Sequence, residues 1–427
     1  MPFPNIEDII ENIVEQVFLD RRRADGVYDY ESLPENFIKL ALVSRNFLDP
    51  VRRNLYGDLR VEGPERFLLL TGQLRFSPHL AKYVKSASLR SSCSESPHID
   101  GYYAHTPGAG EPRIVSSTAF RWFLEACPQL TGLTFIGGNF LWALSVQKPE
   151  TIKLTDILMR GCSRCNAQGC TMELGRGWLK SIVTFPCLRE LDISELPLAD
   201  GPRDPTADMG IGSSACTGLS ISNMNKPTSP TVLMTLFRAM PSLKELVLDG
   251  LQPMARGRLK KCLSIAAPTL TLLTITDYHS EEGHPEPWEN NTVAALRELK
   301  TLSFNGVPVT LPFFDMLPPR LEHLRFSGVT LTFLPAPALA SWLRRDRFPL
   351  RGILKKLEVV GELRTDSVGS APKPKASDDQ VAEIAELCCG LGIEWIYQPN
   401  RYAGAFDEDD ISFDAGSEGE LGVGIAF

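Results

Sequence analysis

Three cysteines in one short polar segment are the residues of this sequence that come nearest to a metal site. They stand at Cys162, Cys165 and Cys170. Three thiolates at this spacing could share a tetrahedral ion if a fourth ligand joined them. A zinc site usually shows a second ligand pair, but no histidine lies near these residues and the next cysteine is Cys187. The spacing therefore favours free thiols in a surface loop, and we expect no bound metal.

The other patterns that could support catalysis are incomplete. The sequence contains no His-Glu-x-x-His, no Walker loop and no Gly-x-Ser-x-Gly elbow. A Gly-x-Gly-x-x-Ala sequence begins at Gly210, but residues 199–208 before it are rich in proline and aspartate. They cannot form the buried strand that a dinucleotide-binding loop requires. These observations predict a protein that is not an enzyme and that binds no cofactor.

The charge of the chain is concentrated at its C-terminal end. The 427 residues carry a formal net charge of −8, and seven of the 52 acidic residues but none of the basic ones follow Arg401. An acidic tail would repel a polyanion, so we expect no nucleic-acid partner. No apolar run approaches the ~18 residues that span a bilayer, which predicts no membrane partner. The first residues lack a basic signal region, so we expect a chain in the cytoplasm or nucleus, with free thiols.

The elements that must position any binding surface are indicated by an internal repeat. The pattern Leu-x-x-Leu-x-Φ, in which Φ is apolar, occurs seven times. The second leucines of these copies are Leu133, Leu191, Leu246, Leu273, Leu302, Leu324 and Leu357. Weaker copies are predicted at Val84/Ala87/Leu89, Ile152/Leu154 and Leu219/Ile221. From Leu191 to Leu302 the steps are 28, 27, 27 and 29 residues, within the ~20–29 range of one class of solenoid repeat.

Each repeat carries a second element before its strand. Ser229-Pro230 is typical of a helix start, and Leu233, Leu236, Phe237 and Met240 then follow at i, i+3, i+4 and i+7. Such a helix–strand unit cannot bury its apolar side alone, so neighbouring units must stack. Within a strand the alternation places Leu191 and Ile193 in the core and Glu190 and Asp192 on the open face.

These repeats resemble the leucine-rich-repeat family over roughly residues 80–360. The resemblance implies an α/β solenoid with a curved parallel sheet inside and helices outside. The family usually has Asn or Cys five residues after the central leucine, to satisfy backbone groups in the turn. The chain has apolar or aromatic residues there, so its turns must be completed differently. These residues are Leu196, Leu251, Tyr278, Val307 and Val329. An ordinary α/β domain with leucine-rich strands is the alternative.

The N-terminal segment has a different pattern. An amphipathic helix is predicted over residues 8–18, and a second one over residues 37–48 that Asp49-Pro50 would stop. The run from Leu40 to Phe47, followed by Leu55-Tyr56-x-Asp58-Leu59, resembles the second half of an F-box, as in fungal F-box-like proteins with leucine-rich repeats. This resemblance implies docking on the adaptor of a cullin-RING ubiquitin ligase. The residues that would dock are Ile9, Ile13, Leu40, Leu42 and Val43. A cap on the solenoid is the alternative role.

The sequence thus predicts three parts: an F-box-like helical domain at 1–61, a degenerate leucine-rich-repeat solenoid at 62–399 and a disordered acidic tail at 400–427. Charged positions on the open strand face are the predicted contacts for a target protein. They are Glu190, Asp192, Glu245, Asp249, His323 and Arg325. The two resemblances together imply the substrate-recognition subunit of an SCF-type ubiquitin ligase, monomeric before assembly. A repeat scaffold without a ligase role is the alternative.

Overall fold

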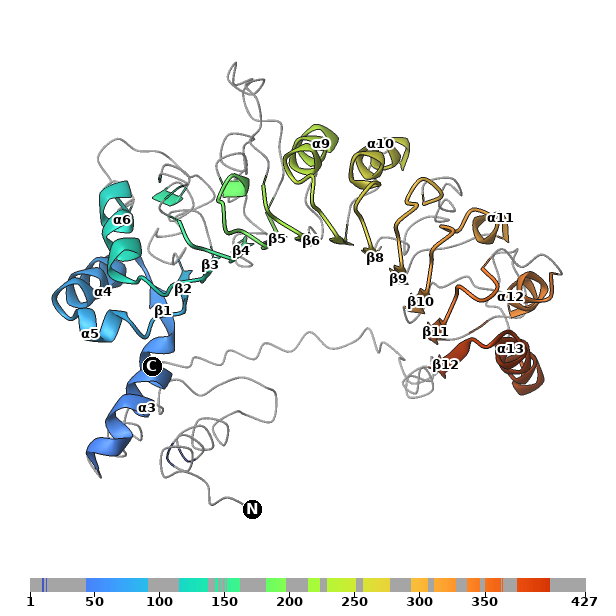
Figure 1. Ribbon diagram of the computed structural model, residues 1–427, viewed down its shortest axis with the longest axis horizontal. Helices are drawn as coiled ribbons and strands as arrows, with labels where there is room; N and C mark the ends of the chain where they lie inside the picture. Colours follow the sequence, from blue (N-terminus) through green and yellow to red (C-terminus); the bar gives the residue numbers. More distant parts are fainter. Residues whose placement is uncertain are drawn as a thin grey trace, which may run out of the picture.

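Twelve five-residue strands lie side by side in one parallel sheet, in the order in which they occur in the chain. The computed structural model describes residues 44–90, 115–136, 152–161, 182–196, 214–222, 229–250, 256–276, 293–305, 311–327, 336–345, 350–361 and 375–399, and the single residues 10, 13, 143, 144, 147, 150 and 363. The strands line the inner side of an arc and the helices its outer side (Figure 1). The predicted solenoid with a curved parallel sheet is confirmed.

The described strands are β1 Asp58–Glu62, β2 Ser86–Arg90, β3 Gly132–Ile136, β4 Asp156–Arg160, β5 Glu190–Ser194, β6 Gly218–Ser222, β7 Glu245–Asp249, β8 Leu272–Thr276, β9 Thr301–Asn305, β10 His323–Ser327, β11 Lys356–Val360 and β12 Glu394–Gln398. The described helices are η1 Arg45–Phe47, α3 Leu48–Gly57, α4 Pro64–Phe76, α5 Pro78–Ala81, α6 Ser117–Ala126, α9 Pro230–Ala239, α10 Arg256–Ala266, α11 Leu311–Phe314, α12 Ala336–Leu343 and α13 Asp378–Leu391. Among the helices of these ranges, none has the length and apolar character needed to cross a membrane.

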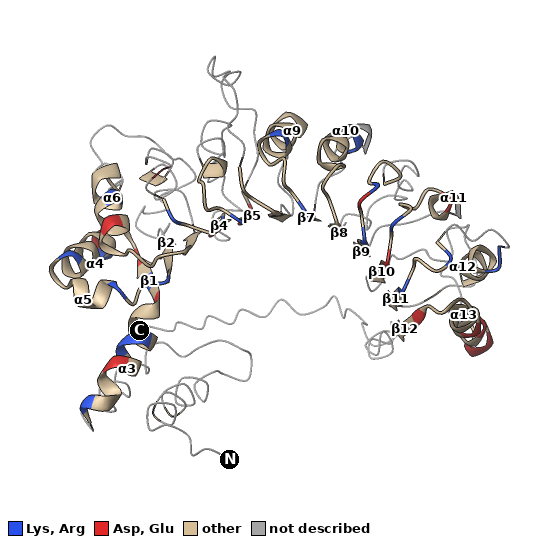
Figure 2. Ribbon diagram, in the orientation of Figure 1, with Lys and Arg blue, Asp and Glu red and all other residues tan. Residues whose placement is uncertain are grey.

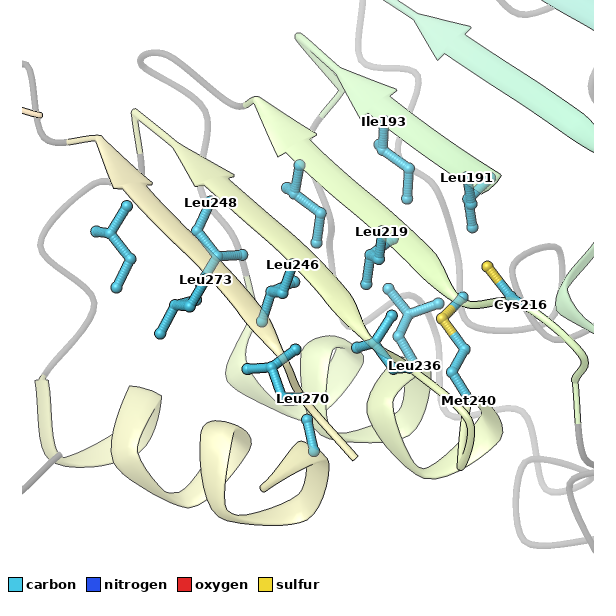
Figure 3. Close-up of a cluster of buried hydrophobic side chains, with 14 of the residues drawn as sticks. Leu191, Ile193, Cys216, Leu219, Leu236, Met240, Leu246, Leu248, Leu270 and Leu273 are labelled. Carbon is cyan, nitrogen blue, oxygen red and sulfur yellow. The ribbon is translucent and has the colours of Figure 1, made fainter. Parts of the chain in front are cut away.

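The second and fourth residues of each strand from β1 to β11 form the core. In β5 these are Leu191 and Ile193, which are almost fully buried. The parallel register pairs Leu191 with Leu219, Leu219 with Leu246, and Leu246 with Leu273. Figure 3 shows these side chains in one layer between the sheet and the helices. A slip of one residue would turn every one of them to solvent, so burial specifies the register.

Helix α9 has the predicted start and the predicted buried face. The Ser229 hydroxyl accepts a hydrogen bond from the Thr231 N–H at 3.2 Å, and Pro230 occupies the first turn. Leu233, Leu236 and Phe237 are buried against the sheet. A helix is about 10 Å wide whereas strands are ~4.8 Å apart. Stacked helix–strand units therefore form an arc with the helices on its outer, longer side and the strands on its inner side.

Backbone groups complete the turns that lack the asparagine of the family. The first residue after a strand donates its N–H to the last carbonyl of a neighbouring strand, as Glu195 does to Ser222 at 2.6 Å and Gly250 to Thr276 at 3.0 Å. The same bond is made by Gly63, Gly161 and Gly361. Most of these residues are glycines, and several adopt a positive φ, including Glu195 at 56°. These backbone bonds extend the ladder by one residue beyond the strand ends, where glycine accepts a positive φ at little cost.

One of the weaker repeat copies was predicted in the wrong place. Strand β4 buries Ile157 and Met159, whereas Ile152 and Leu154 are buried ahead of the strand. The motif here begins at Leu154 and has an isoleucine where the other copies have their second leucine. The copies at Ala87/Leu89 and Leu219/Ile221 coincide with β2 and β6 and are confirmed.

The predicted helix end at Asp49-Pro50 is wrong. Ser44 is extended and caps η1, after which α3 begins at Leu48 and runs through both residues. Pro50 lies in the first turn of α3, where a proline removes no helical hydrogen bond. Strand β1 follows Gly57 directly and extends across the predicted boundary at residue 61. Most of residues 1–43 and all of the tail at 400–427 lie outside the described residues.

The turn after β4 generates a stability prediction. A Cβ placed on Gly161 would overlap the carbonyl oxygen of Glu195, so the neighbouring turn must shift to accept any side chain there. We expect Gly161→Ala to lower the free energy of unfolding by about 2 kcal/mol, measured by urea denaturation. Gly390→Ala is the matched control, since a Cβ on Gly390 in α13 meets no atom within 4 Å. An equal loss in both variants would contradict the predicted clash.

Candidate functional site

The open face of the sheet is lined by the first, third and fifth residues of each strand. Because all strands are in register, these residues form three rows that run across the sheet. Glu190 and Asp192 project from β5, and Glu245 and Asp249 from β7, with only β6 between them. The sequence-based assignment of these four residues to the open face therefore agrees with the structure.

The structure separates the six predicted target contacts into two groups. His323 and Arg325 also lie on the open face, but on β10, three strands beyond β7. Arg325 Nε lies 3.7 Å from Oε1 of Glu358 on β11. Lys356 Nζ lies 3.7 Å from Oε2 of the same glutamate. Figure 2 shows charges of both signs near β10 and β11. On this part of the face, Arg325 and Lys356 thus share one carboxylate, which compensates part of their charge.

The group on β5 and β7 lines a hollow of about 360 Å³ that extends from β2 to β7. Glu190, Asp192 and Glu245 contribute to its wall, and so does Asp156 of β4. Asp249, at the far end of β7, is not among the lining residues. Sequence reasoning missed Asp156 because the motif of β4 was centred on Ile152. With the motif at Ile157, Asp156 takes the place that Glu190 has in the next repeat.

The hollow is acidic and has an apolar floor. Asp156 and Glu190 are direct partners in the register of β4 and β5, and like charges placed opposite each other on neighbouring strands repel. The lining residues include four carboxylates but no lysine or arginine. Leu158 and Val247, both partly exposed, provide apolar surface in the middle row. Such a surface suits a group that is cationic at one end and apolar along its length.

Asp192 is the most strongly perturbed group of the hollow. Burial raises the pKa of its carboxyl, and the opposing effects of a hydrogen bond with Ser220 and the charge of Arg160 are smaller. Its Oδ1 atom is buried and has no hydrogen-bond partner in the part of the chain that the structure describes. Arg160 is itself engaged, since it forms an ion pair with Glu195 at 3.3 Å. The described residues thus compensate the charge of Asp192 only in part.

The predicted adaptor contacts fall almost entirely outside the described residues. Ile9, Leu40, Leu42 and Val43 belong to that part of the chain. Ile13 is described and is 41% exposed.

The C-terminal half of the F-box-like segment is described and is fastened to the first repeat. The Tyr83 hydroxyl donates to the Asp49 carboxylate of α3, and the Lys85 N–H donates to the Gly57 carbonyl at 3.0 Å. The hydrogen bond from Tyr83 is also the main reason why the pKa of Asp49 is lowered.

The cysteine loop at Cys162, Cys165 and Cys170 also lies outside the described residues. In the parts of the chain that the structure describes, no three His, Cys, Asp or Glu side chains are placed to hold a metal ion. The adjacent Cys388 and Cys389 behave as expected for neighbours on a helix, since Cys388 is buried and Cys389 is exposed. Burial raises the pKa of the Cys388 thiol to about 12, which suits a packing role.

Comparisons with known proteins identify no family for this chain. No family model matches it, and no curated protein matches it. Among solved structures, it is similar to a chain in the crystal structure of the Rad7 and Elc1 complex in yeast, with 12% sequence identity and a TM-score of 0.42. The match covers 89% of this chain and 85% of that one. At this level the similarity concerns the fold and says nothing about partners.

Asp192 generates a prediction for the dependence of stability on pH. Because its pKa in the folded chain is above the ordinary value of 3.8, the folded chain holds this proton more tightly than the unfolded chain. The stabilisation is complete below the unfolded pKa and is lost as pH rises through the folded pKa. We therefore expect Asp192→Asn, a neutral isostere, to melt at a higher temperature than the unaltered chain at pH 7. The difference should shrink as pH falls toward 3.8.

Glu245→Gln is the control for this measurement, because Glu245 is exposed in the same hollow and the change removes the same charge. A smaller increase in melting temperature is expected for it. An equal increase in both variants would show that general repulsion, and not the burial of Asp192, destabilises the folded chain.

Proposed function

We propose that this chain is the substrate-recognition subunit of an SCF-type cullin-RING ubiquitin ligase. Its N-terminal helices bind the adaptor of the ligase, and its open sheet face binds a target protein. The chain contributes no catalytic group of its own and acts by raising the concentration of the target at the ligase. We place it in the cytoplasm or nucleus, where free thiols such as those of Cys127 and Cys216 stay reduced.

The connection between the F-box-like segment and the sheet is the observation that carries this proposal. Leu55 and Tyr56 lie in α3 and Asp58 and Leu59 in β1, so the F-box-like sequence continues into the first strand without a linker. The bonds from Tyr83 and Lys85 hold α3 against the first repeat. The described part of the N-terminal segment is therefore joined rigidly to the sheet. A receptor that works by proximity needs such a connection, because a flexible joint would dilute the target.

A protein-interaction scaffold without a ligase role is the second candidate. It is favoured by the acidic hollow on the open face, which needs no adaptor to bind a partner. The two candidates differ only in what the N-terminal segment does, so a test of adaptor binding distinguishes them.

Adaptor binding is tested by co-purification of the full chain with the adaptor. We expect Leu42→Asp with Val43→Asp to reduce the amount of co-purified adaptor at least tenfold, since two buried charges would oppose an apolar interface. The matched control is Leu68→Asp with Leu69→Asp on α4, two adjacent leucines that are 48% and 75% exposed. It should leave adaptor binding unchanged. If the unaltered chain captures no adaptor, the ligase role is contradicted and the scaffold role remains.

A further inference from the structure

We propose that the open sheet face binds an arginine side chain of a partner protein in a notch above Gly218, between Glu190 of β5 and Glu245 of β7. The inference deepens the proposed function. It rests on that function for one point, namely that the partner is a target of the ligase. It identifies the class of that target as a protein that presents arginine in an extended segment.

The notch follows from the register of three neighbouring strands. Glu190 pairs with Gly218, and Gly218 pairs with Glu245. Strands are ~4.8 Å apart, so the two glutamates are separated by about 10 Å. Both side chains are exposed on the open face, and the residue between them has no side chain. The two side chains therefore flank a position that has no side chain of its own and that lies beside the stem of Glu190, and a guanidinium can approach both carboxylates there.

Nothing in the backbone or the packing requires glycine at position 218. Its φ is not among the positive values of the described glycines. A Cβ there would make only ordinary contacts, at 3.5 Å from Cγ of Glu190 and 3.8 Å from the Arg189 carbonyl oxygen. Glycine inside a strand weakens it and often marks a place where a ligand or another chain approaches closely. The missing side chain thus keeps the notch open at a cost in strand stability.

No lysine or arginine is among the described residues that line the hollow around the notch. Asp156 stands beside Glu190 in the same row, and Asp192 stands behind it in the middle row. The buried Oδ1 of Asp192 has no hydrogen-bond partner among the described residues. The nearby cation, Arg160, is paired with Glu195. A cation in the notch would relieve the repulsion among these carboxylates and would be attracted to the face from a distance.

Arginine fits this site better than a metal ion or lysine does. Within the described residues no group of side chains is placed to hold a metal ion. The planar fork of a guanidinium can bind two carboxylates at once, whereas an ammonium acts as a point charge. Leu158 and Val247 supply apolar surface beside the carboxylates, and the aliphatic stem of arginine packs on such surface.

The shape of the hollow indicates that the arginine belongs to an extended segment. Its volume of about 360 Å³ is at the lower end of the range of ligand pockets. It is spread over strands β2 to β7, so it forms a shallow trough across the sheet. A trough of this kind suits one or two side chains of a segment that crosses the strands, and a second glycine, Gly132, leaves space in the same row.

The test uses the full chain and a fluorescein-labelled nine-residue peptide of glycine and serine with two arginines, measured by fluorescence anisotropy at low ionic strength. We expect the peptide with citrulline in place of arginine to bind at least tenfold more weakly, because citrulline keeps the shape and loses the charge. The peptide with lysine should also bind more weakly. Equal affinity of the arginine and citrulline peptides, or no binding of the arginine peptide, would overturn the proposal.

Variants of the chain separate the notch from general charge attraction. Glu190→Gln with Glu245→Gln should weaken binding of the arginine peptide at least tenfold. Glu62→Gln with Glu394→Gln removes two exposed charges from the same face outside the hollow and should change binding less than twofold. Gly218→Val fills the notch, keeps all charges and should also weaken binding at least tenfold. Equal effects of the two charge pairs, or full affinity of Gly218→Val, would refute the notch.

Melting curves show whether each variant folds, and Gly218→Ser is the smaller filling to use if the valine variant does not. The peptide measurement needs no adaptor. A failure here therefore rejects the arginine notch and leaves the adaptor test unaffected, whereas a failure to capture adaptor rejects the ligase role and leaves the notch unaffected.

Discussion

The burial of two apolar side chains from each strand of β1 to β11, between the sheet and the outer layer, is the interaction on which the rest of this structure depends. Each such leucine contributes roughly 1.5–3 kcal/mol when it leaves water. Leu191, Leu219, Leu246 and Leu273 are register partners in four successive strands. Their burial aligns the strands, and this alignment in turn places the alternate residues of all strands in rows on the open face.

Because the buried residues stabilise the fold and the alternate residues do not, the open face can carry charges that repel one another. Residues such as Asp156, Glu190 and Glu245 have no part in the core, so repulsion among them costs little compared with the buried leucines. The same holds for Gly218, whose missing side chain weakens one strand of a sheet that has eleven others. A surface with charge and space that the fold does not need is suited to a partner that supplies the opposite charge.

The N-terminal end of the solenoid is a direct connection between helix α3 and the first strand of the sheet. Helix α3 enters β1 at Gly57 without a linker, and Tyr83 holds Asp49 of that helix. Helix α3, the described part of the N-terminal segment, is therefore held in place relative to the strand rows. The acidic hollow begins at β2, one strand beyond this joint.

Local patterns in the sequence determined most of the strands with their buried positions, though not those of β4, and the start of α9 at Ser229-Pro230. Alternation, helical periodicity and capping act between residues close in the chain. The same patterns placed Glu190 and Glu245 on the open face. Only the tertiary structure decided that Asp156 lines the same hollow as Glu190 and Glu245 and that His323 does not. Neighbours in a row come from different strands, and the connections between those strands are of unequal length. It also decided that Pro50 lies within α3. A proline disrupts a helix that comes before it but is tolerated in the first turn of a helix that follows. Here the cap at Ser44 and the hydrogen bond between Tyr83 and Asp49 accompany a helix that follows.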